Sequence, residues 1–131
     1  MIKIKSFEFA VRIVKFYQFL CNEKKEFVLS KQVLRSGTSI GAMVREAEHS
    51  ESKADFIHKL SIAQKEINET IYWLDLLRAT DYISPQQFES IHADAVEIIK
   101  LITLREYLEL DNHNKFLYHA KLHEVVDLNN D

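Results

Sequence analysis

The sequence has very few of the residues that interrupt helices. Among its 131 residues there are only two glycines, Gly37 and Gly41, and one proline, Pro85. An all-β fold needs many turns, and glycine and proline are the residues that most often mark them. Their scarcity therefore predicts an all-α fold, with long helices joined by short connections.

Only one cysteine is present, so the chain cannot form an internal disulfide. Cys21 lies within an apolar helical pattern, which indicates a buried thiol in a reducing compartment. No apolar run approaches the ~18 residues that a membrane span requires. The first residues also lack the cleavage site of a signal peptide. We therefore expect a cytoplasmic protein that does not enter a membrane.

No linker or low-complexity segment divides the chain, so residues 1–131 are predicted to form a single domain. Apolar periodicity predicts helices over about 7–23, 31–50, 53–79 and 85–110, followed by a short C-terminal tail over 111–131. Short connections between such helices favour an antiparallel, up-and-down four-helix bundle.

Four serines stand where the predicted helices begin and are expected to act as N-caps: Ser6, Ser30, Ser52 and Ser84. The last of them has the most specific surroundings. Ser84 is followed by Pro85 at the first helical position and by Gln87 three residues on, which is the pattern of a capping box.

The first predicted helix has more apolar surface than one core can cover. Its apolar residues form two arcs, Phe7, Ala10, Val11, Val14 and Tyr17 on one side and Phe9, Ile13, Phe16 and Leu20 on another, which together span roughly 220°. The third helix likewise carries Ile62, Trp73 and Leu76 beside its core stripe. We predict a homo-oligomer whose subunit interface contains Phe9, Ile13, Phe16, Leu20, Ile62, Trp73 and Leu76. The alternative is that the tail from Phe116 onward covers this surface.

Gly37 and Gly41 lie one helical turn apart and leave one face of the second helix almost without side chains. Glycine inside a helix costs about 1 kcal/mol relative to alanine, so two of them favour close packing against another helix. A phosphate-binding loop is the weaker interpretation, because no strand and no Lys-Ser/Thr pair accompanies the G-x-x-x-G spacing.

Two Glu-x-x-His pairs, Glu46 with His49 and Glu89 with His92, resemble the ligands of a di-iron helical bundle. His49 ends one helix and His92 follows the turn after the next, some 27 residues or ~40 Å away, so these groups cannot share a metal. His119 and His123 supply only two ligands. No serine or cysteine is placed as a nucleophile. The sequence therefore predicts neither a catalytic site nor a metal or cofactor.

Charge is distributed unevenly along the chain. Residues 1–35 contain eight Lys and Arg against three Glu, whereas residues 36–131 contain nine basic residues against seventeen acidic ones. Basic side chains gather around the first helix and the connection after it: Arg12, Lys15, Lys24, Lys25, Lys31 and Arg35. This cluster is either a nucleic-acid or partner-binding surface or a set of ordinary solvated charges. Glu66 and Glu69 are expected to pair with Arg35 or Arg45, or else to remain solvated.

The central part of the sequence, LRSGTSIGAMVREAEHSESKADFIHKLSIAQKEINETIYWLDLL, resembles the four-helix bundle proteins related to those encoded in intervening sequences of bacterial 23S rRNA genes. The resemblance covers about residues 6–110. It is most specific at these positions: Arg35, Ser39-Ile40, Glu46-Ala47, Asp55-Phe56, Ala63, Lys65-Glu66, Glu69 and Tyr72-Trp73-Leu74. Met43 departs from the family pattern, which normally has asparagine there.

This resemblance implies a ring-shaped homopentamer without known enzymatic activity. Related proteins include accessory subunits of diversity-generating retroelements, which bind a reverse transcriptase and nucleic acid through a strongly basic surface. The present chain has a pI of about 6.1. We therefore expect a non-enzymatic oligomeric scaffold or adaptor, with a nucleic-acid-binding accessory protein as the alternative.

Overall fold

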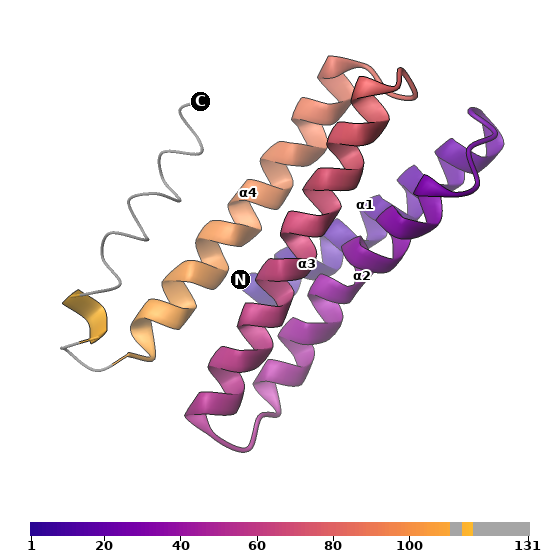
Figure 1. Ribbon diagram of the computed structural model, residues 1–131. Coiled ribbons are helices and arrows are strands. Elements are labelled where there is room, and N and C mark those ends of the chain that lie inside the picture. Colours follow the sequence, from indigo (N-terminus) through magenta and orange to yellow (C-terminus); the bar gives the residue numbers. More distant parts are fainter. Residues whose placement is uncertain (111–113, 117–131) are drawn as a thin grey trace.

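The computed structural model describes residues 1–110 and 114–116 of the chain. Residues 1–110 contain four helices and no strand: α1 (Ile2–Asn22), α2 (Leu29–Glu48), α3 (Lys53–Ala79) and α4 (Pro85–Leu108). Each helix packs against its neighbour in sequence and α1 also packs against α4, while the diagonal pairs make no close backbone contact (Figure 1). The all-α, antiparallel four-helix bundle is thus confirmed.

Two of the predicted N-caps are confirmed. The Ser52 hydroxyl accepts the backbone N–H of Asp55 at 3.0 Å. Ser84 forms a complete capping box, because its hydroxyl accepts the Gln87 N–H at 3.1 Å while the Gln87 side chain accepts the Ser84 N–H at 2.8 Å. These hydrogen bonds fix the starts of α3 and α4 where the sequence places them.

The other two predicted caps are wrong. Helix α1 begins at Ile2, so Ser6 lies inside the helix, is buried, and donates its hydroxyl to the Lys3 carbonyl at 3.2 Å. Helix α2 begins at Leu29, so Ser30 is also helical. At both sites helical residues continue upstream of the serine, and its hydroxyl therefore bonds to a carbonyl rather than to a free N–H group.

Glu26 caps α2 in place of Ser30. Its carboxylate accepts the backbone N–H groups of Val28 at 3.1 Å, Leu29 at 2.9 Å and Ser30 at 2.6 Å, and the residue is only 7% exposed. The Ser30 hydroxyl donates in return to the Glu26 carbonyl at 2.8 Å. A negative group that satisfies three free N–H groups at the positive end of a helix closes the α1–α2 connection onto α2.

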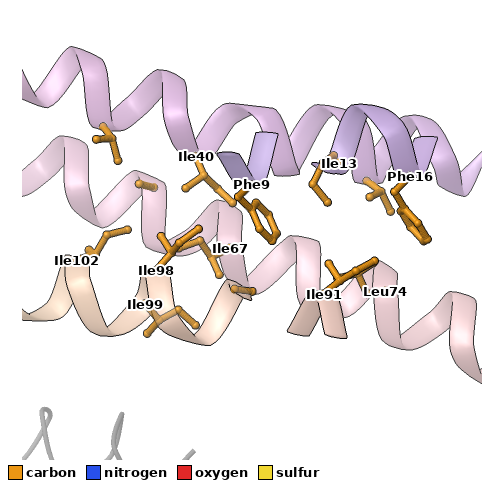
Figure 2. Close-up of a cluster of buried hydrophobic side chains, with 14 of the residues drawn as sticks. Phe9, Ile13, Phe16, Ile40, Ile67, Leu74, Ile91, Ile98, Ile99 and Ile102 are labelled. Carbon is orange, nitrogen blue, oxygen red and sulfur yellow. The ribbon is translucent and has the colours of Figure 1, made fainter. Parts of the chain in front are cut away.

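The core of the bundle is built from inward-facing residues of all four helices. Figure 2 shows the side chains of Phe9, Ile13 and Phe16 turned toward the helices that carry residues such as Ile67 and Ile98. Exposure is 2% for Phe9, 0% for Ile13, 8% for Phe16 and 0% for Leu20. These four residues therefore form the α1 part of the core, and their predicted place in a subunit interface is wrong.

The two glycines of α2 face α1 at close range. A β-carbon at Gly37 would lie 2.8 Å from both Cγ1 and Cγ2 of Ile13, and one at Gly41 would lie 3.3 Å from the Ser6 carbonyl oxygen. Carbon atoms do not approach to 2.8 Å without displacement. The glycines thus allow α1 to seat against α2, which is the close helix packing expected from their spacing.

None of the helices in the described part of the chain is both long enough and apolar enough to span a membrane. The predicted tail over 111–131 lies outside the described residues, except for residues 114–116. The His119 and His123 pair lies outside them as well.

Candidate functional site

An exposed apolar stripe runs along the face of α1 that points away from the bundle. It consists of Ile4, Phe7, Val11 and Val14, which are 59%, 53%, 40% and 39% exposed. Their 3-4-3 spacing aligns them on one face of the helix, roughly opposite the arc that contains Ile13. We call these four residues the α1 outer stripe. Its spacing is that of a helix–helix packing seam, and the described part of the chain leaves much of its apolar surface exposed.

Charged residues border the α1 outer stripe. Glu8 and Lys15 are exposed on the flank of the stripe that faces α4, and neither forms an ion pair with a residue that the structure describes. On the side of α2, the Arg45 guanidinium lies 5.4 Å from the centre of the Phe7 ring. The stripe therefore presents an apolar centre with charged edges, which is the common anatomy of a protein–protein contact.

A second stripe lies along α3, on the side next to α2. Its members follow a 4-3-4-3 spacing and are all half-buried: Ile62, Glu66, Glu69, Trp73 and Leu76. We call them the α3 side stripe. Its apolar members are the three α3 residues that the sequence predicted for a subunit interface. Because they are partly exposed, they remain available for that role, which stays a prediction.

Polar contacts order the middle of the α3 side stripe. The Arg35 guanidinium of α2 bonds to Glu66 at 3.3 Å and forms a short ion pair with Glu69. The Trp73 indole N–H donates to Glu69 at 3.2 Å, and the ring of Tyr72 meets Trp73 edge-on with centroids 5.0 Å apart. The hydrogen bonds from Arg35 and then Trp73 hold the pKa of the Glu69 carboxyl below its ordinary value.

The predicted pairing of Glu66 and Glu69 with a helix-two arginine is thus confirmed for Arg35. Arg45 lies against Phe7 instead. Arg35 also has a raised pKa, chiefly because of its hydrogen bond with Glu69, and therefore stays charged.

Only some side chains of the predicted basic cluster are available for binding a partner in the structure. Arg12 donates to the Ser90 hydroxyl at 2.6 Å and to Asp94 at 2.6 Å, which ties α1 to α4 across a groove of about 460 Å³. Arg35 is held by α3 as described above. The four lysines of the cluster are all exposed: Lys15, Lys24, Lys25 and Lys31. The structure thus assigns its two arginines to helix packing.

No metal site is found among the described residues, where no group of three or more His, Cys, Asp or Glu side chains comes together. Glu46 pairs with Lys59 at 3.7 Å, and the ring of His92 stacks on Phe88 with centroids 5.2 Å apart. His49 follows the last residue of α2, whereas His92 lies in the second turn of α4. The two Glu-x-x-His pairs therefore lie toward opposite ends of the bundle (Figure 1).

Comparison with known proteins places the chain in a family. The model of the 23S rRNA-intervening sequence protein family matches residues 1–104. The chain belongs to that family. It is also similar to a solved structure of a protein with unknown function from the S23 ribosomal protein family of Bacteroides thetaiotaomicron VPI-5482. The two share 62% identity over 81% of this chain and 98% of that one, with a TM-score of 0.80. No curated protein matches the chain.

Membership of the 23S rRNA-intervening sequence protein family confirms the resemblance drawn from the central motif. Several residues that carry that resemblance gather in one place in the structure, since Arg35, Glu66, Glu69 and Trp73 form a single network. Met43, where the family pattern normally has asparagine, is partly buried and packs against the hydrophobic core. The thioether suits these apolar surroundings because it needs no hydrogen-bond partner.

Proposed function

We propose that this protein is a non-enzymatic, homo-oligomeric scaffold or adaptor whose copies meet through the α1 outer stripe. The observation that carries the proposal is the exposure of Ile4, Phe7, Val11 and Val14 on one face of one helix. Fully burying one such side chain contributes about 1.5–3 kcal/mol. Because these four are roughly half exposed, covering them would contribute ~3–6 kcal/mol before the cost of association.

The resemblance drawn from the central motif of the sequence supports a protein that assembles from several copies. The resemblance favours five copies in a ring. In such a ring each exposed surface of the bundle is repeated once per copy around the axis. The use of Arg12 and Arg35 in ion pairs between helices is consistent with a structural role.

The test is the solution mass of the wild type and of Val11→Glu, measured by light scattering over a dilution series. We expect the wild type to have several times the 15.4 kDa of one chain. The new carboxylate would be buried without a partner at the interface, which costs several kcal/mol. We therefore expect the dissociation constant of the oligomer to rise about 100-fold or more.

The matched control is Val28→Glu, which places the same charge at an apolar position that is 72% exposed but lies outside the stripe. We expect it to leave the mass unchanged. A wild type that stays monomeric at all concentrations would refute the proposal.

A further inference from the structure

We infer that the α1 outer stripe of one copy packs against the α3 side stripe of the next, in a closed ring whose axis runs along the bundles. This inference rests on the proposed oligomeric function and names the surface that receives α1. It follows from the composition, the charge and the relative heights of the two stripes.

The α3 side stripe has the composition of a binding surface. It combines half-buried Ile62, Trp73 and Leu76 with a guanidinium and with the ring of Tyr72, which is 58% exposed. Trp, Tyr and Arg are the residues that most often dominate binding energy at protein interfaces. The ion pairs of Arg35 hold this surface in one arrangement, so that little side-chain freedom remains to be lost on docking.

The two stripes are also complementary in charge. Arg35 provides one positive charge to the two carboxylates of Glu66 and Glu69, which leaves one negative charge in excess at the middle of the α3 side stripe. Lys15, at the edge of the α1 outer stripe, has no ion-pair partner in the described part of its own chain. Contact between the stripes would bring this lysine to the two carboxylates. Lys65 lies about 100° around α3 from Glu66, on the other flank of the stripe.

The heights of these groups along the bundle agree. Gly37 of α2 lies directly opposite Ile13 of α1. Because α1 and α2 are antiparallel, Lys15 and Arg35, each two residues away from that contact, lie at the same height. Arg35 in turn lies level with the two glutamates of α3 that it binds. Rotation about an axis along the bundle does not change height, so Lys15 of one copy meets Glu66 and Glu69 of the next.

The same argument fixes the register of the apolar contact. Helices α1 and α3 run in the same direction (Figure 1). Val11 lies four residues before Lys15, and Ile62 lies four residues before Glu66, so these two apolar side chains come to the same height. The register therefore places an apolar pair one helical turn below the charged contact.

A two-fold contact between two α1 outer stripes would leave the α3 side stripe uncovered and would stop at two copies. A contact between two different surfaces that closes by rotation covers both stripes in every copy. The structure therefore favours the ring over the symmetric pair.

Disulfide cross-linking tests this contact. In a Cys21→Ser background that retains the wild-type mass, Val11→Cys and Ile62→Cys are prepared separately, mixed under conditions that exchange subunits, and oxidised. We expect covalent dimers from the mixture and none from either variant alone. A chain that carries both substitutions should give a ladder of covalent species that ends at the number of copies in the ring. Val28→Cys mixed with Ile62→Cys is the control and should give no dimer.

Cross-linking of Val11→Cys alone would overturn the inference in favour of a two-fold α1 contact. An oligomer that gives no cross-link in any combination would overturn it as well, while leaving the proposed scaffold function intact. A monomeric wild type would instead refute the function itself.

Lys15→Glu provides a second measurement that leaves the core unchanged. We expect this variant to raise the dissociation constant of the oligomer about tenfold or more, because it sets a third carboxylate against Glu66 and Glu69. An unchanged dissociation constant would contradict the charged contact.

Discussion

Glu26 is the residue whose local chemistry is most unusual in this chain. Burial acts to raise the pKa of its carboxyl, but the N–H groups of Leu29, Ser30 and Val28 outweigh burial and hold the pKa below the ordinary value of 4.5. The charged form is therefore favoured by the folded protein. A glutamate four residues before a helical serine is not a standard capping signal, since the contact depends on how the preceding connection folds. The sequence alone could therefore identify Ser52 and Ser84 but not Glu26.

We predict that Glu26→Gln lowers the free energy of unfolding by about 1–2 kcal/mol near neutral pH, because a neutral amide is a weaker acceptor for three N–H groups. Chemical denaturation measures this difference. Glu23→Gln is the matched control, because this exposed residue lies at the C-terminal end of α1. Its free energy of unfolding should differ from that of the wild type by no more than a few tenths of a kcal/mol.

The pH dependence follows from the direction of the pKa shift. A lowered folded-state pKa gives a stabilisation that is complete above the ordinary value of 4.5 and is lost as the pH falls below it toward the folded-state value. On acidification through this range, the wild type should lose the extra stability that separates it from Glu26→Gln. If the free energy of unfolding depends on pH in the same way for both proteins, the role of the carboxylate is contradicted.

At the scale of the helices, α1 shows what apolar periodicity predicts and what it leaves undetermined. The two arcs of α1 were evident in the sequence, and both exist. Which arc faces inward depends on α2, where Gly37 leaves room for the branched side chain of Ile13 and Gly41 leaves room for the Ser6 backbone. Periodicity describes one helix at a time, so it could not decide between the arcs. The core stripe of α3 was unambiguous in the sequence, and Ile62, Trp73 and Leu76 lie half-buried beside it.

We predict that the destabilisation caused by Gly37→Ala becomes smaller when Ile13 is replaced by alanine. In the wild type the added methyl group overlaps Ile13, and overpacking costs about 1–3 kcal/mol, more than the ~1 kcal/mol that alanine contributes to the helix. In an Ile13→Ala background the two γ-carbon contacts are removed and only the 3.2 Å approach to the Cβ atom of residue 13 remains, so the same change should cost clearly less than in the wild type. Denaturation of the four proteins of this cycle measures the coupling. Equal effects in both backgrounds would mean that the two helices are not in close contact there.

At the scale of the whole molecule, the charge of the first 35 residues is less available than the sequence indicates. Arg12 and Arg35 were candidates for binding a partner or nucleic acid, but both lie in ion pairs with other helices. Sequence distance hides such pairs, because Arg12 and Asp94 are 82 residues apart. The fold was thus largely predictable, whereas the candidate surface depended on contacts between helices.

We predict that the protein does not bind RNA or DNA detectably at about physiological salt, because the four exposed lysines of the basic cluster, on a chain of net charge −3, give little electrostatic attraction. Fluorescence anisotropy over a salt series is the measurement. Binding that weakens with salt and is lost in Lys24→Glu/Lys25→Glu would instead support the alternative of a nucleic-acid-binding accessory protein.

Helix α1 belongs to the core of its own bundle through one face and carries the α1 outer stripe on the other. If copies associate through that stripe, the helix cannot leave its bundle without also leaving its neighbour. Folding and association are then one linked equilibrium, and mass action makes the melting temperature rise with protein concentration.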